Sequence, residues 1–218
     1  MRICNYFCVC LLLSVISCGP RERVSKEVFD AVNKHMEAKK LSDSQIMEGA
    51  IVWGDSIAEA AQFQFITKLQ NTIKERGIVE AVPFCNLEGT QITADLESQF
   101  GISIKRAASR ARNKSNLPIG MEIELLDAYK YNTENDISNR PNIQKIEDGK
   151  VLLYTKAIVI KDKFCLSCHG VPQVDIQPET FKKINELYPQ DSAKNFAVGD
   201  LRGMWSIRLP KKEVVIKL

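Results

Sequence analysis

Histidine is nearly absent from this chain, which has two copies, His35 and His169, in 218 residues. This scarcity weakens the case for catalysis, because histidine is the commonest general acid or base in enzymes. No nucleophile–base pair, paired carboxylates or phosphate-binding loop stands out either. We therefore expect a protein that is not an enzyme.

A charge of one sign is also missing. Lys and Arg total 30 and Asp and Glu total 27, which gives a net charge of +3, and the two signs are interspersed. This balance argues against a nucleic-acid partner and against an acidic or basic tail. The 44% of hydrophobic and 26% of charged residues are typical of a globular protein.

No apolar run is long enough to cross a bilayer comfortably. The N-terminal run extends from Tyr6 to Ile16 behind a single positive charge, Arg2, as in a secretory signal. Residues 15–18, Val-Ile-Ser-Cys, resemble the bacterial lipobox, in which the cysteine becomes the lipidated first residue. We expect a signal peptide over residues 1–17, lipid on Cys18, and a membrane-anchored protein outside the cytoplasm, facing the periplasm or in the outer membrane. An ordinary signal peptide cut nearby and a short uncleaved anchor are the alternatives.

Thiols are few once the signal is removed. Of seven cysteines, three would leave with the signal peptide and Cys18 would carry lipid, so Cys85, Cys165 and Cys168 remain. An odd number of thiols in an exported chain does not indicate a disulfide framework.

The hydrophobic pattern predicts an α+β fold with an antiparallel sheet. Apolar residues recur every three or four positions over residues 46–73, as on one long amphipathic helix, and a second helix is expected from Pro83 to Gly101. The pattern then favours strands at "ISIKR", "VLLYTKAIVI" and "GMWSIRL", and a helix at "MEIELLDAYKYN". We expect residues 41–218 to form the domain and residues 18–40 a membrane-proximal linker or helix.

The chemistry concentrates in "KFCLSCHG", residues 163–170. Cys165 and Cys168 are three positions apart and His169 follows directly, which is the Cys-x-x-Cys-His motif of c-type haem attachment. Two thioether bonds to the porphyrin need two sulfurs at a fixed separation, which a two-residue spacer on a tight turn provides, and the histidine binds the iron. Chance would give about 0.002 such matches in a chain of this composition. We therefore predict one covalently attached haem c.

Zinc and a redox dithiol are the chemical alternatives. Zinc could use Cys85, Cys165, Cys168 and one histidine, but structural zinc usually recruits a second paired ligand spacing, and the sequence has none. A thioredoxin-like dithiol would open a helix after a βαβ pattern, which is also missing. Export favours haem again, because covalent haem attachment takes place outside the cytoplasm.

The second axial ligand of the iron stays open from the residues alone. The candidates are His35, Cys85, Met36, Met47, Met121 and Met204. His35 lies among lysines, as on a solvated face, whereas methionine and a lone cysteine are more often packing residues.

Four segments resemble a known family. They are "GIVEAVPFCNLEGTQI", "IKRAASRARNKSNLP", "YTKAIVIKDKFCLSCHG" and "YPQDSAKNFAVGDLRGMWSIRLP", in this order over about residues 40–210. Together they are similar to a family of exported single-haem c-type proteins with a PAS-like fold, long catalogued only as a domain of unknown function. The resemblance implies a PAS-like antiparallel sheet with long N-terminal helices. It also implies Cys85, on the helix before the basic strand, as the second axial ligand. Pro83 and Lys114-Ser115 depart from the family's pattern.

A basic cluster offers partners for the two haem propionates. It consists of Lys105, Arg106, Arg110, Arg112 and Lys114. We favour Arg106 and Arg110, because guanidinium forks suit carboxylates and "IKRAASR" lies inside a family-like segment. The alternative is a solvated strand edge and loop.

These observations predict one-electron transfer by a lipid-anchored protein with an unidentified redox partner protein. The alternative is a redox or gas sensor, because the PAS-like fold implied by the resemblance is a common sensor module. A sensor would take a small diatomic gas as ligand and would work through a separate partner. A haem peroxidase is disfavoured, because it needs a polar catalytic pair at an open distal site.

Overall fold

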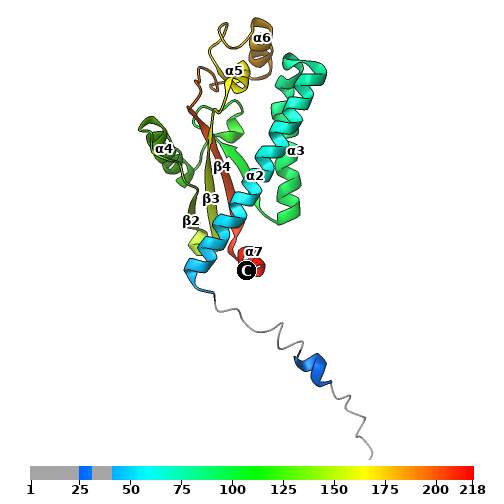
Figure 1. Ribbon diagram of the computed structural model, residues 1–218, viewed down its shortest axis with the longest axis vertical. Coiled ribbons are helices and arrows are strands. Elements are labelled where there is room, and N and C mark those ends of the chain that lie inside the picture. The colour runs from blue at the N-terminus through cyan, green and yellow to red at the C-terminus, as the bar shows by residue number, and fades with distance from the viewer. Residues whose placement is uncertain (1–24, 31–40) are drawn as a thin grey trace, which may run out of the picture. The chain divides into compact units, whose positions relative to one another are not determined.

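The long apolar stripe forms α2, Asp43–Arg76, in the computed structural model (Figure 1). Ser42 begins this helix with a capping box: its Oγ accepts a hydrogen bond from the Gln45 amide at 3.2 Å, and the Gln45 side chain accepts one from the Ser42 amide at 2.9 Å. Gly77 ends the helix with a φ of 84°, which favours glycine. The structure describes residues 25–30 and 41–218, except for the side chains of residues 85–88.

The second helix, α3, runs over Ile78–Phe100 and begins earlier than expected. The sequence predicted a start at Pro83, but this proline lies inside the helix. Pro83 is the sixth residue of α3, so it lies beyond the first turn and removes the hydrogen bond that an amide at this position would donate to the Val79 carbonyl. Gly101, with a φ of 63°, ends α3.

Four strands form one antiparallel sheet, as the sequence predicted in outline. They are β1 (Ser103–Ala107), β2 (Asn142–Ile146), β3 (Val151–Val159) and β4 (Leu201–Pro210), in the order β1-β4-β3-β2. The remaining helices are α4 (Met121–Glu134), α5 (Lys163–His169), α6 (Pro178–Leu187) and α7 (Lys211–Lys217). The α+β prediction is therefore confirmed, although β2, α5, α6 and α7 were not predicted.

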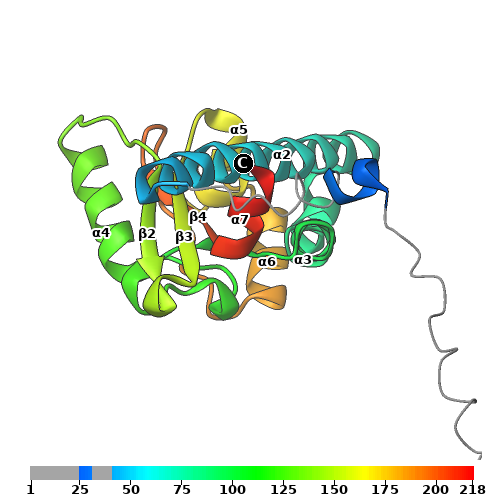
Figure 2. The same cartoon turned by 90° about the horizontal axis from the view of Figure 1, so that it is seen from below.

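Helices cover both faces of the sheet (Figure 2). On one face, β3 and β4 place Tyr154 and Ile207 against α2 in the largest hydrophobic core. On the other face, Met204 of β4 packs against Leu126 and Tyr129 of α4. Because side chains alternate along a strand, the neighbours Met204 and Trp205 belong to opposite cores.

One end of the sheet collects the segments that carry the predicted site. The register pairs Ala107 with Met204 and Val159 with Leu201, so β1 and β3 end where β4 begins. The chain therefore leaves β1 and β3, and enters β4, at the same end of the sheet. Figure 1 shows α5 and α6 beyond this end. The haem motif and the basic cluster meet there.

The N-terminal segment is a separate unit, residues 1–40. Of this unit the structure describes residues 25–30, in which residues 26–30 are helical. The predicted signal peptide and Cys18 lie outside the described residues. Within the described ranges, no helix combines the length and apolar character that a membrane crossing needs.

Candidate haem site

The two motif cysteines lie on one side of the short helix α5. Asp162 begins this helix, and its Oδ1 accepts a hydrogen bond from the Phe164 amide at 2.8 Å. Cys165 and Cys168, both half-buried, are three positions apart and so share one side of the helix. The sequence motif predicts a tight turn here. A helix meets the same requirement, because three residues make nearly one helical turn.

His169 is the last residue of α5, and the loop before β4 holds its side chain. The imidazole Nδ1 lies 2.9 Å from the carbonyl oxygen of Ala193. Because a carbonyl can only accept, Nδ1 carries the proton and Nε2 keeps its lone pair. The Phe196 ring stands edge-on to the imidazole, with centroids 6.2 Å apart, and the Phe196 amide donates to the His169 carbonyl at 3.0 Å. The imidazole is thus oriented with Nε2 left for a metal.

The electrostatic surroundings keep this imidazole neutral. Burial lowers the pKa of His169 well below its usual value, and the positive charges of Arg202 and Arg112 lower it further. The hydrogen bond to Ala193 opposes these effects without reversing them. A neutral imidazole is the form that binds iron.

Arg106 lies between α2 and α3. Its guanidinium carbon is 4.1 Å from the centroid of the Phe65 ring and 6.0 Å from that of Trp205. A Cβ at Gly89 would lie 2.8 Å from Arg106 Nη2, so this glycine lets the guanidinium approach the helix. Gly89 is one turn beyond Cys85, which places the Arg106 charge beside the turn that bears Cys85.

Arg110 reaches the motif through Phe196. Its guanidinium carbon lies 3.9 Å from the centroid of that ring, and the guanidinium carbon of Arg202 lies 5.6 Å from it. Arg202 Nη1 also donates to the Arg110 carbonyl at 3.2 Å. Since Phe196 contacts His169, two arginines stand one side chain away from the imidazole.

Arg112 makes the most direct contacts with the motif, although the sequence analysis did not select it from the basic cluster. Its Nη2 donates to the Cys168 carbonyl at 2.6 Å and to the Ala193 carbonyl at 3.3 Å. Its Nε lies 3.3 Å from Asp191 Oδ1. No periodicity marks Arg112 as buried, and its partner is 79 residues away. Pairing across that distance leaves no signal in a single sequence.

The position of Cys85 follows from its backbone, because its side chain lies outside the described residues. Val82, one turn earlier in α3, is buried, and the Tyr188 hydroxyl donates to its carbonyl at 3.4 Å. The Tyr188 ring lies 6.0 Å from the guanidinium carbon of Arg112, which bonds Cys168. These contacts place the turn of α3 that carries Cys85 at the same end of the sheet as α5.

The described methionine candidates are packed in hydrophobic clusters or exposed. Met204 is fully buried on the α4 face, and Met47 packs against the core beneath α2. Met121 is exposed at the start of α4. His35 and Met36 lie outside the described residues.

The described residues suit a haem at this motif. Two sulfurs share one side of α5, the imidazole offers Nε2, and Arg112 Nη1 is a buried donor for which the described residues supply no acceptor. A propionate carboxylate would satisfy such a donor.

The two alternatives fit less well. No three His, Cys, Asp or Glu side chains gather as a metal site among the described residues, so zinc would have to recruit a ligand from outside them. Every strand pair in the described sheet is antiparallel, so this part of the chain lacks the βαβ unit of a thioredoxin-like dithiol.

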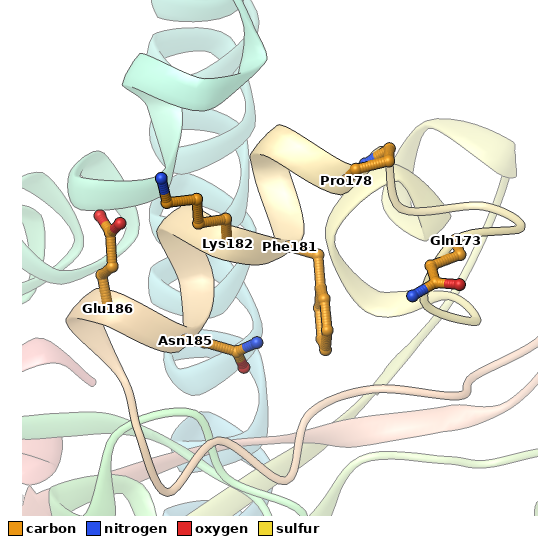
Figure 3. A pocket seen from close by; sticks show the side chains of 6 residues that line it. All are labelled: Gln173, Pro178, Phe181, Lys182, Asn185 and Glu186. Atoms are coloured by element: carbon orange, nitrogen blue, oxygen red, sulfur yellow. The ribbon is translucent and has the colours of Figure 1, made fainter.

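Two surface cavities lie away from the haem motif, residues 163–170. One, of about 510 Å³, is formed by α6 and the loop before it, and Figure 3 shows Phe181 and Asn185 on one side of the helix and Lys182 on another. A second, of about 450 Å³, lies between α2 and α3 and includes Pro83 and Phe84. Neither is lined by a residue of the haem motif.

Comparison with known proteins identifies the family. A model of the Tll0287-like family (Tll0287) matches residues 22–210. The crystal structure of the cyanobacterial haem protein Tll0287 is similar to this chain, with 24% sequence identity and a TM-score of 0.47 over 68% of this chain and 91% of that chain. No curated protein matches. Because the family model spans far more than half of the sequence, the chain belongs to the Tll0287-like family.

Proposed function

We propose that this protein binds one haem covalently through Cys165 and Cys168, with His169 and Cys85 as axial ligands, and that it transfers single electrons. We further propose that it works outside the cytoplasm, anchored to a membrane by lipid on Cys18. A haem held by these residues would supply one-electron chemistry between a donor protein and an acceptor protein.

One observation carries the proposal. Two half-buried thiols share one side of α5, and the next residue presents a neutral imidazole whose Nδ1–H is already engaged by Ala193. Such a second partner fixes the orientation of a ligating histidine. The family supports the same conclusion, because Tll0287 is described as a haem protein.

The arginines around the motif have assigned roles in this proposal. Arg106 and Arg110 are the partners of the propionates, and Arg112 Nη1 is a third donor for them. Cys85, as a thiolate, adds a negative charge to the iron and lowers its reduction potential, whereas a methionine would raise it. The protein is therefore a low-potential electron carrier with a PAS-like fold.

Absorption spectroscopy of the purified protein tests both the attachment and the ligands. We expect haem that stays with the polypeptide after denaturation, and loss of this covalent haem in Cys165→Ser and Cys168→Ser. Cys85→Ala is the matched control, because it removes a thiol but not an attachment point. It should keep the covalent haem and shift the Soret band, since an axial ligand is lost.

Three outcomes would contradict the proposal in whole or in part. A wild-type chain without covalent haem would refute it entirely, and an unchanged spectrum in Cys85→Ala would refute the assignment of the thiolate. Binding of carbon monoxide by the reduced wild-type protein would favour the gas sensor over the carrier, because a pure carrier keeps both axial ligands.

A further inference from the structure

We propose that Arg112 and Asp191 form a positioning pair that orients the His169 imidazole and raises the reduction potential of the iron. This inference rests on the proposed function, since it concerns the histidine as an axial ligand. It assigns to the buried ion pair a role beyond the proposed contact of Arg112 Nη1 with a propionate, since neither partner forms the covalent attachment or binds the iron.

The pair is buried and engaged on two edges. The Arg112 side chain is 7% exposed and that of Asp191 is 0% exposed. Arg112 Nε lies 3.3 Å from Asp191 Oδ1, and Nη2 lies 3.3 Å from Oδ2. Burial of two charges carries a desolvation cost, which the ion pair and the hydrogen bonds of Arg112 Nη2 and of Asp191 offset.

Each partner also binds the backbone that holds the histidine. Asp191 Oδ1 accepts from the Ala193 amide at 2.8 Å, which fixes the loop. Arg112 Nη2 donates at the same time to the carbonyls of Ala193 and Cys168. The Arg112 guanidinium therefore links Cys168, the residue before His169, to Ala193, whose carbonyl accepts a hydrogen bond from His169 Nδ1.

The shared carbonyl links this geometry to the iron. The Ala193 oxygen accepts from His169 Nδ1 at 2.9 Å and from Arg112 Nη2 at 3.3 Å. An oxygen already bonded to a cation is a weaker acceptor, so it draws the Nδ1 proton less and leaves the imidazole a weaker electron donor. The guanidinium charge also favours the reduced iron, which has one positive charge fewer. Both effects raise the reduction potential.

A structural clamp would predict something different. If the pair only stabilised the fold, its loss would lower the stability of the protein and nothing else. If it positions the histidine, its loss also changes the orientation of the imidazole and the electron density at the iron. Lysine in place of Arg112 separates these cases, because it keeps the charge but lacks the planar fork that binds a carboxylate on two edges.

The experiment compares Arg112→Lys, Arg112→Gln and wild type as haem-loaded, full-length proteins. The reduction potential is measured by titrating one electron from dithionite onto the iron and removing it with ferricyanide. The orientation of the axial imidazole is read from the ferric electron paramagnetic resonance g-values. Arg208→Gln is the control for charge, because Arg208 pairs with Glu147 at the opposite end of β4.

We expect Arg112→Gln to lower the potential and to change the g-values. Arg112→Lys should change the g-values similarly with a smaller shift in potential, and Arg208→Gln should match wild type in both. Wild-type g-values in both Arg112 variants, or a potential shift in Arg112→Gln no larger than in Arg208→Gln, would overturn the inference. Failure of Arg112→Lys to fold would also overturn it, because the pair would then be a structural clamp. Absence of haem from the wild type would instead refute the proposed function.

Discussion

Gly54 and Gly89 are both buried, but a methyl group added at each position would meet a different neighbour. Gly54 of α2 lies against the Tyr154 ring, which a Cβ would overlap. A Cβ at Gly89 of α3 would meet the far end of Arg106 instead. The fully buried ring cannot move aside, whereas a guanidinium at the end of a long side chain can. The two sites therefore differ in cost although both lie inside helices.

We predict that Gly54→Ala lowers the free energy of unfolding by about 1–3 kcal/mol, as overpacked cores do. Gly89→Ala should change it by less than about 1 kcal/mol, because the higher helix propensity of alanine offsets the displacement of Arg106. Urea denaturation of the two variants measures both values. Equal destabilisation would show that Arg106 is as firmly fixed as Tyr154.

At the residue scale, the sequence revealed the motif but not its support. Cys165, Cys168 and His169 are adjacent in the chain, so their spacing alone indicates the chemistry. Arg112 and Asp191 act together across 79 positions, and neither belongs to a periodic pattern. A residue that works through a distant partner is visible only once the chain is folded.

The contact between β3 and α2 contains Tyr154, whose pKa is strongly raised. The Tyr154 hydroxyl donates to Asp55 Oδ1 at 2.5 Å, and Lys156 Nζ lies 2.8 Å from the same oxygen. Burial raises the pKa of Tyr154 far above its usual value of 10.0, and the hydrogen bond to Asp55 adds to the increase. The folded protein therefore keeps this hydroxyl protonated at alkaline pH.

Unfolding releases Tyr154 to ionise near pH 10, so the folded state loses stability as the pH rises above that value. Below pH 10 this group makes the protein no more or less stable as the pH changes. We predict a loss of about 1.4 kcal/mol per pH unit above pH 10 from this group. Unfolding by urea between pH 9 and 11.5 measures the slope. In Tyr154→Phe the free energy of unfolding should fall less steeply with pH, by the amount that one bound proton contributes. An unchanged slope would contradict the prediction.

At the element scale, the long periodic segments were predictable, and so was the short strand β1, but several other short elements were not. The stripe that became α2 and the β-rich run that became β3 extend over many residues, so their periods are clear. β2 has five residues at the edge of the sheet, and α5 has seven. The predicted start of α3 at Pro83 is wrong, because the helix begins at Ile78 and the proline lies inside it.

At the scale of the whole molecule, the four family-like segments come together at one end of the sheet. They form the first part of α3, most of β1 with the loop after it, the second part of β3 with α5, and the loop before β4 together with β4 itself. The net charge of +3 hides the local result, which is four arginines around one imidazole. The resemblance therefore includes the residues of the site together with core residues of β3 and β4, such as Tyr154 and Ile207.

The division into two units gives the last prediction. The haem motif and its arginines all lie in the unit of residues 41–218, and Cys18 lies in the other. Replacement of residues 1–18 by the signal peptide of a soluble exported protein should therefore move the protein from the membrane to the soluble fraction with an unchanged haem spectrum. Fractionation and absorption spectroscopy measure the two effects. In the unaltered protein, mass spectrometry should find an N-terminal cysteine that carries acyl chains. These chains would anchor the protein, because each buried methylene contributes about 0.8 kcal/mol. A mature N-terminus at another residue would refute the lipid anchor and leave the haem site untouched.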